Sequence, residues 1–249
     1  MPWKHIIVSL PAKDLQAAMS DVSSFQQGQE CSGLDLLLNV VDHAAFLTTV
    51  CGAQLHVMTV SDDATVSECQ QEILRLASES GISLSDPVCS VLSPDTWYAE
   101  SSQIAELDAV LVKGMSQLEA AGPDRGKVPI WYVAERLSHL DGISTAALVP
   151  PHCRSEAVVE FVNLAIQFPL RLTLLMYGSE DEDRDQVMAA LDGADIRSAE
   201  YGVQVDWTKS DWPDVPGRRE FDLLMTIGES SADAAKSNSL SILTLPDVH

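Results

Sequence analysis

The side chains in this sequence best suited to chemistry are histidines that lie beside or within apolar segments. His5 and His152 flank two corresponding apolar segments, and His56 lies inside a third. A histidine can exchange a proton or bind a metal near neutral pH. Inside a strand, however, a histidine is more often hydrogen-bonded in the core or at an edge, and we expect this structural role for His56. His5 and His152 are the stronger functional candidates, because each is expected to flank the first strand of its half, near the ligand-binding edge of the sheet.

The acidic run at residues 179–183 is similar to carboxylate clusters that bind divalent cations. It also precedes an expected helix, whose positive dipole end favours acidic residues, and we therefore interpret it as a helix start. The sequence contains no P-loop, no Gly-x-Ser-x-Gly turn, no His-Glu-x-x-His motif and no Gly-x-Gly-x-x-Gly motif. We expect no catalytic residue and no metal site, and a protein that is not an enzyme.

The cysteines form no CxxC pair, so neither a disulfide framework nor a zinc site is predicted. Two of them, Cys51 and Cys89, have apolar neighbours in the sequence and are expected to be small core residues. Cys153 follows His152 after an expected strand and is interpreted as a loop thiol.

The formal net charge is −22, with 15 Lys and Arg against 37 Asp and Glu. Nucleic acids and anionic membranes both require a cationic surface, so neither is an expected partner. The longest apolar run is interrupted by Asn39, Asp42 and His43, and no signal-peptide pattern is seen. We therefore expect a cytoplasmic protein, whose scattered acidic surface confers solubility and would suit a saline host.

The sequence repeats one pattern at residues 107–114 and 221–228, where an apolar residue and Asp precede an apolar run that ends in Gly. Such a run is typical of a strand buried on both faces of a parallel sheet. Other segments match in the same order: 4–11 with 144–151, 54–62 with 171–179, and 129–133 with 241–245. The matches predict an internal duplication, with domains at residues 1–140 and 143–249.

Strands are predicted to alternate with helices along both halves. In the first half, strands are expected near 5–10, 54–60, 87–92, 109–113 and 129–133, with helices at 34–50, 66–80 and 101–107. In the second half, strands are expected near 145–149, 171–177, 203–207, 222–227 and 240–245, with helices at 155–168, 180–191 and 213–220. The extra segment 12–30 of the first half fits either an amphipathic surface helix or a loop.

The predicted fold class is α/β, with two repeated domains that each hold a five-stranded, mostly parallel sheet flanked by helices. The join near residues 140–143 is too short for a flexible tether. We therefore expect the halves to pack as an internal pseudo-dimer.

Five parallel strands, with Asp, an apolar run and Gly at the fourth and a fifth strand close behind, resemble the universal stress protein family. The chain is most similar in pattern to tandem members, which hold two such domains in one polypeptide. This resemblance covers essentially the whole chain and rests on strand pattern and spacing. It implies an open α/β sheet, pairing through the edge of the fifth strand, and an association with stress survival.

Nucleotide-binding members of that family carry an acidic residue at the end of the first strand. After the fourth strand they carry Gly-x-x-Gly, followed after nine intervening residues by Gly and a Ser or Thr. Those glycines let backbone N–H groups approach the phosphates at a helix N-terminus, and the hydroxyl completes the cradle. The resemblance makes a Gly and a Ser in each half the candidates for a surviving nucleotide pocket: Gly114, Ser116, Gly228 and Ser230.

The rest of that signature is missing. Gln117 replaces the second Gly in the first half, and Glu229 and Asp233 stand where phosphates would bind in the second. The first strands end in Leu10-Pro11 and Val149-Pro150-Pro151, which supply no acidic residue. Carboxylates beside a triphosphate oppose its binding at reduced dielectric. We expect that neither half binds ATP in the family's usual way, and no cofactor is predicted.

The expected function is that of a non-catalytic stress-response or regulatory protein that acts by binding a protein or a ligand, with its nucleotide sites lost. The alternative is an adenine-nucleotide or metabolite sensor that retains a pocket at the carboxyl ends of the strands. A partner protein or self-association is expected at the fifth-strand edge. Aromatic loops at Trp97 and Trp212 are either further contact surfaces or lids over each domain's own core.

Overall fold

In the computed structural model of the chain, the described residues are 3–25, 33–61, 63, 65–93, 96, 108–114, 128–134, 144–149, 159, 162, 171–177, 181–193, 204–208, 221–227 and 241–245. The chain divides into two compact units, Met1–Leu137 and Ser138–His249. Predictions for helices at 101–107 and 213–220 and for the loops at Trp97 and Trp212 lie outside the described residues.

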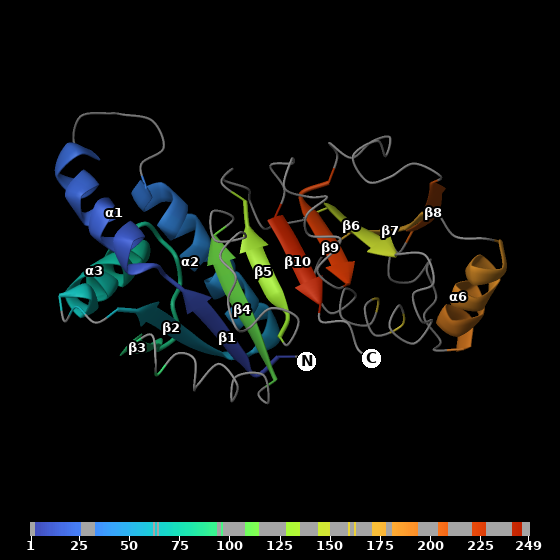
Figure 1. Cartoon of the computed structure of the whole chain (residues 1–249), viewed down its shortest axis with the longest axis horizontal. Coiled ribbons are helices and arrows are strands. Elements are labelled where there is room, and N and C mark those ends of the chain that lie inside the picture. The colour runs from blue at the N-terminus through green and yellow to red at the C-terminus, as the bar shows by residue number, and fades with distance from the viewer. Residues whose placement is uncertain are drawn as a thin grey trace. The chain divides into compact units, whose positions relative to one another are not determined.

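The first unit contains a five-stranded sheet in which every described pairing is parallel (Figure 1). The strands pair in the order β3-β2-β1-β4-β5. Their bounds are β1 His5–Ser9, β2 Gln54–Val60, β3 Val88–Leu92, β4 Ala109–Gly114 and β5 Ile130–Val133. Each lies within one residue of its predicted bounds, which confirms the α/β class and the parallel sheet.

The apolar runs form this sheet because both of its faces are buried. On β1, Ile6 and Val8 point to one face and Ile7 to the other, and none of the three is more than 3% exposed. The same holds for β4 between Ala109 and Val112. Strands covered on both faces need continuous apolar sequence. These strands therefore do not alternate apolar and polar residues, as a strand with one exposed face does.

Three helices are described in the first unit: α1 Ala12–Phe25, α2 Gly33–Cys51 and α3 Val66–Glu79. α2 packs on β1, β4, β2 and β5, and α3 packs on α2 and β3. α1 packs on α2 and α3, with Leu15 and Ala18 fully buried. The helix alternative for the extra segment is therefore confirmed for residues 12–25, whereas 26–32 lie outside the described residues.

Among the described residues, α2 is the one helix that could cross a membrane by length and composition. In the fold it is a core helix, with 61% of that window buried against the sheet and the other helices. It ends at Cys51, and the φ of 62° at the following Gly52 lets the amide of Ala53 donate to the carbonyl of Thr48 at 3.0 Å.

Two polar side chains tie α2 to β5. The amide of Asn39 donates to the carbonyl oxygen of Ala134 at 3.1 Å, and the indole Nε1–H of Trp131 donates to Nδ1 of His43 at 3.2 Å. His43 is 1% exposed, and burial lowers its pKa to about 4. Because Nδ1 accepts this bond, the ring hydrogen is on Nε2, which has no hydrogen-bond partner among the described residues.

A second buried polar residue, Gln70, fastens α3 to the edge of the sheet. Its side-chain amide donates to the carbonyl of Val57 at 3.0 Å, and lies 3.2 Å from the hydroxyl of Thr59 and 3.3 Å from the carbonyl of Ser90. Since these partners belong to β2 and β3, one side chain joins the helix to two strands.

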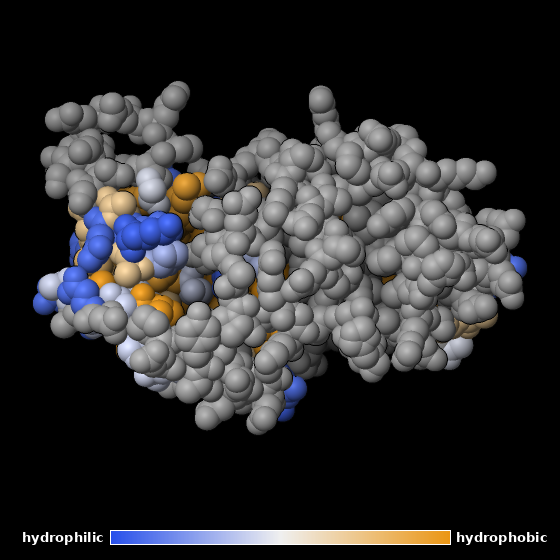
Figure 2. All heavy atoms as spheres, viewed as in Figure 1, coloured by the Kyte–Doolittle hydropathy of each residue, from blue (hydrophilic) through white to orange (hydrophobic). Residues whose placement is uncertain are grey.

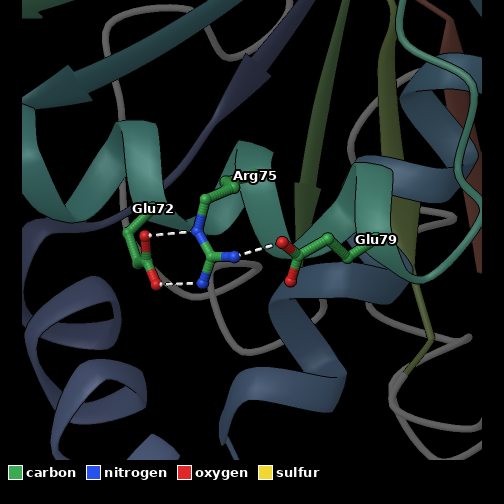
Figure 3. Close-up of polar contacts among 3 residues, drawn as sticks. All are labelled: Glu72, Arg75 and Glu79. Carbon is green, nitrogen blue, oxygen red and sulfur yellow. Dashed lines mark hydrogen bonds and ion pairs between the residues drawn. The ribbon is translucent and has the colours of Figure 1, made fainter.

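The outer face of α3 is held by charges instead. Arg75 binds Glu72 through two hydrogen bonds of 2.6 and 2.8 Å and also binds Glu79 (Figure 3). The three side chains are substantially exposed, so solvent screens their attraction. In Figure 2, blue, hydrophilic residues lie at the surface where Figure 1 places α1 and α3.

The second unit has five strands whose described pairings are also parallel, in the order β10-β9-β6-β7-β8. Their bounds are β6 Ser144–Val149, β7 Arg171–Tyr177, β8 Gln204–Thr208, β9 Leu223–Ile227 and β10 Ser241–Leu245. Helix α6, Asp181–Gly193, begins within the acidic run, as predicted. Of the helix predicted at 155–168, Val159 and Val162 are described, and both are helical.

The buried His43 predicts a specific loss of stability in acid. Its pKa is near 6.5 when unfolded and about 4 when folded, so the unfolded state binds the proton first as the pH falls. This contribution to stability is complete above pH 6.5 and is lost progressively down to pH 4. We expect the native chain to lose about 2 kcal/mol more than a His43→Gln variant between pH 7 and pH 5, measured by urea unfolding. Equal losses in the two proteins would contradict the assignment.

Replacing Gln70 tests the joint between α3 and the sheet. Gln70→Leu leaves buried acceptors without their donor, and we expect the free energy of unfolding in urea to fall by about 1–3 kcal/mol. The matched control is Arg75→Gln on the same helix, which breaks exposed ion pairs and should have a much smaller effect. If the free energy of unfolding falls equally in the two variants, the Gln70 hydrogen bonds do not stabilise the joint between α3 and the sheet.

Candidate functional site

In open α/β sheets, ligands bind beyond the carboxyl ends of the strands, where successive crossovers change side. In the first unit, β2 and β3 lie on one side of β1, and β4 and β5 lie on the other. The change falls between β1 and β4, which end at Ser9 and Gly114 (Figure 1). The candidate site of this unit is therefore the edge formed by these strand ends and the loops that follow them.

The turn after β1 is short and closed by backbone bonds. The amide of Leu10 donates to the carbonyl of Met58 at 3.0 Å, and the carbonyl of Pro11 accepts from the amides of Asp14 and Leu15 at 3.1 and 3.0 Å. Leu10 is 1% exposed. A buried apolar side chain thus occupies the end of the first strand, so the chain offers no carboxylate there to a ligand.

The loop between β2 and α3 supplies a carboxylate of its own at the helix start. Oδ1 of Asp63 accepts from the amide of Thr65 at 2.9 Å and from its hydroxyl at 2.8 Å, and Oδ2 accepts from Gln16 of α1 at 3.3 Å. The bonds from Thr65, and then the one from Gln16, lower the pKa of Asp63. An ionised carboxylate at this place satisfies the positive end of α3 and repels a second anion.

The fourth strand places a cation at the same edge. Lys113 is 9% exposed and is the one buried lysine or arginine among the residues whose burial is described. It pairs in register with Tyr132 of β5 and directly precedes Gly114, which pairs with Val133. Sequence reasoning missed Lys113, although a lysine inside an apolar run was the available signal.

Of the nucleotide-pocket candidates, Gly114 lies where predicted, at the carboxyl end of β4. Ser116, Gly228 and Ser230 lie outside the described residues, so their part in a pocket stays a prediction. The same is true of His152 and Cys153.

His5 is not at the expected edge. The chain enters β1 at His5 and leaves it at Ser9, so His5 lies at the amino end of the strand, opposite the candidate site. Its Nδ1 lies 3.0 Å from Nε2 of His56, and both side chains are half-buried. His56 is therefore a hydrogen-bonded histidine, as expected, but its partner was not foreseen because cross-strand register cannot be read from either segment alone.

The cysteine predictions held for one residue and failed for the other. Cys51 is buried, and this burial raises the pKa of its thiol to about 11. Cys89 is exposed, because β3 is the outermost described strand of its sheet beyond β2. No group of three or more His, Cys, Asp or Glu side chains among the described residues could hold a metal ion.

No protein-family model matches the chain, and no curated protein matches its sequence. Its structure is similar to the cytoplasmic domain of a prokaryotic cation chloride cotransporter, with a TM-score of 0.53 and 8% identity over 98% of this chain and 96% of that one. It is also similar to a universal stress protein from Archaeoglobus fulgidus DSM 4304, with a TM-score of 0.51 and 12% identity over 97% of this chain and 96% of that one. Identities this low show the fold alone, and the chain therefore has a universal-stress-protein-like α/β fold.

Proposed function

We propose that this chain is a non-catalytic regulatory protein, built like the tandem universal stress proteins, that acts by binding a protein or a ligand. Its association with stress response is part of the proposal and comes from the resemblance in fold and strand pattern. A cytoplasmic location fits the same picture, since an acidic surface of this kind confers solubility.

Strand pairing supports the tandem arrangement. In the first unit β1 lies between β2 and β4, and in the second β6 lies between β7 and β9. The third strand of each unit pairs with the second, and the fifth pairs with the fourth. The same order in both halves, together with the matched sequence segments, favours duplication of one domain.

The observation that supports the proposed loss of the usual ATP site is the kind of groups that the described chain places at the carboxyl edge. Leu10 fills the end of β1 with an apolar side chain, and the carboxylate of Asp63 binds at the start of α3. A triphosphate at this edge would approach the exposed, ionised carboxylate of Asp63, and like charges repel. Binding of a protein or of an uncharged ligand has no such cost.

A partner protein is the favoured ligand, with the fifth-strand edge as its expected site. This site comes from the resemblance, which implies pairing through the edge of the fifth strand, here β5, whose pairing within the first unit is with β4.

The second candidate is a sensor that binds an adenine nucleotide or another anionic metabolite at the switch between β1 and β4. The buried Lys113 favours it, because a cation beside Gly114 supplies the positive charge that the missing glycine run does not. The two candidates differ in whether this edge recognises an anion.

Titration calorimetry with ATP and Mg²⁺ separates these candidates. We expect no heat of binding and no adenine nucleotide released from the purified protein on denaturation, because Leu10 and Asp63 occupy the edge. Micromolar binding or a co-purified nucleotide would overturn the proposal. Binding that is lost in Lys113→Gln and kept in Lys13→Gln, a change at an exposed residue of α1, would establish the sensor.

A further inference from the structure

The closest contact between two titratable rings in the described chain joins β1 to β2. Nδ1 of His5 and Nε2 of His56 are 3.0 Å apart, and the ring centroids are 5.1 Å apart with the planes tilted by 54°. The strands pair His5 with Gln54 and Ile7 with His56, so the two histidines are diagonal neighbours on one face of the sheet. Their Cα positions are fixed by two hydrogen-bonded strands and not by a loop.

The pair lies at the amino edge of the sheet, away from the carboxyl edge considered above. Both rings are half-buried, so each keeps some contact with solvent. An imidazole binds a metal ion through an unprotonated ring nitrogen, and the partial exposure of both rings leaves this pair accessible to an ion.

A carboxylate stands beside this pair. The carbonyl of Asp108 accepts from the amides of Lys4 and His5 at 2.6 and 3.1 Å, and its carboxylate binds the ammonium of Lys4 at 2.6 Å. The hydrogen bond and the charge of Lys4 lower the pKa of Asp108, with a smaller contribution from His5. The ion pair with Lys4 offsets the charge of Asp108, and the net charge of the whole chain, −22, favours the approach of a cation.

We propose that His5 and His56 form a binding site for a divalent transition-metal ion, and for Cu²⁺ above the others. Metal–imidazole bonds are about 2.0–2.1 Å long, so two nitrogens 3.0 Å apart subtend roughly a right angle at the ion. That is the cis angle of tetragonal Cu²⁺ or Ni²⁺ sites, whereas a tetrahedral Zn²⁺ site separates its nitrogens by about 3.3 Å. Cu²⁺ also binds most tightly in the general order of divalent metals.

The site needs no loss of a proton when both rings are neutral. One of the two facing nitrogens carries a hydrogen, and this hydrogen moves to the outer nitrogen of the same ring as both facing nitrogens bind the ion. Water fills the remaining coordination positions, because the described residues offer no third His, Cys, Asp or Glu ligand within a metal-binding group. The site is therefore weaker than a four-ligand structural site, and exchangeable.

Cu²⁺ alone, added as its glycine complex to the intact chain, tests the site by calorimetry and by electron paramagnetic resonance. We expect one exchangeable Cu²⁺ per chain with two coordinated imidazole nitrogens, and weaker binding of Zn²⁺. His5→Gln and His56→Gln should each lower the Cu²⁺ affinity at least about tenfold. His43→Gln is the matched control and should leave the affinity unchanged, because that histidine is buried against Trp131.

Three results would overturn the proposal. These are a resonance spectrum of the native protein with fewer than two imidazole nitrogens, an affinity unchanged in both variants, or Zn²⁺ binding tighter than Cu²⁺. The spectrum of the native protein decides the question even if a variant fails to fold, and circular dichroism identifies that case. Any Cu²⁺ bound by the terminal amine is unaffected by the two substitutions and is recognised by its lack of imidazole coupling.

Discussion

The parallel pairing of β1 between β2 and β4 is the constraint on which the rest of the first unit depends. A strand at this position is buried on both faces, which requires the continuous apolar run from Ile6 to Val8. Parallel neighbours also require crossovers, and the first of them holds α1 and α2. The same pairing also sets the two edges of the sheet. His5 lies at the amino end of β1, and Leu10 follows its carboxyl end.

Much of this fold could be predicted from the sequence, because strands buried on both faces and helices packed on them leave strong patterns. The strand limits followed from apolar runs, and α2 followed from its apolar stripe, including Leu34 and Leu37. Properties set by strand direction or neighbours could not be predicted in this way. The edge on which His5 lies, the exposure of Cys89 and the contact of His56 all depend on the order and register of strands far apart in the sequence.

At the candidate site, the sequence predicted what is missing better than what is present. Leu10-Pro11 lacks the carboxylate of nucleotide-binding relatives, and the structure adds that Leu10 is buried and that the carboxylate of Asp63 binds at the start of α3. The hydrogen bond from Gln16 to Asp63 joins two segments far apart in the sequence, so no local pattern predicts it. These described groups lie at the carboxyl edge, whereas the amino edge holds two imidazoles within hydrogen-bond distance of each other.

We propose that this universal-stress-protein-like sheet lacks the usual nucleotide site because Leu10 replaces the carboxylate after β1 and Asp63 places a negative charge at the same edge. The most direct measurement is a nuclear magnetic resonance titration of the isotope-labelled chain with ATP and Mg²⁺, following the amides of Leu10, Asp63 and Gly114. We expect these three resonances not to move as nucleotide is added. Saturable shifts of all three would place the nucleotide at this edge and show that the site is retained.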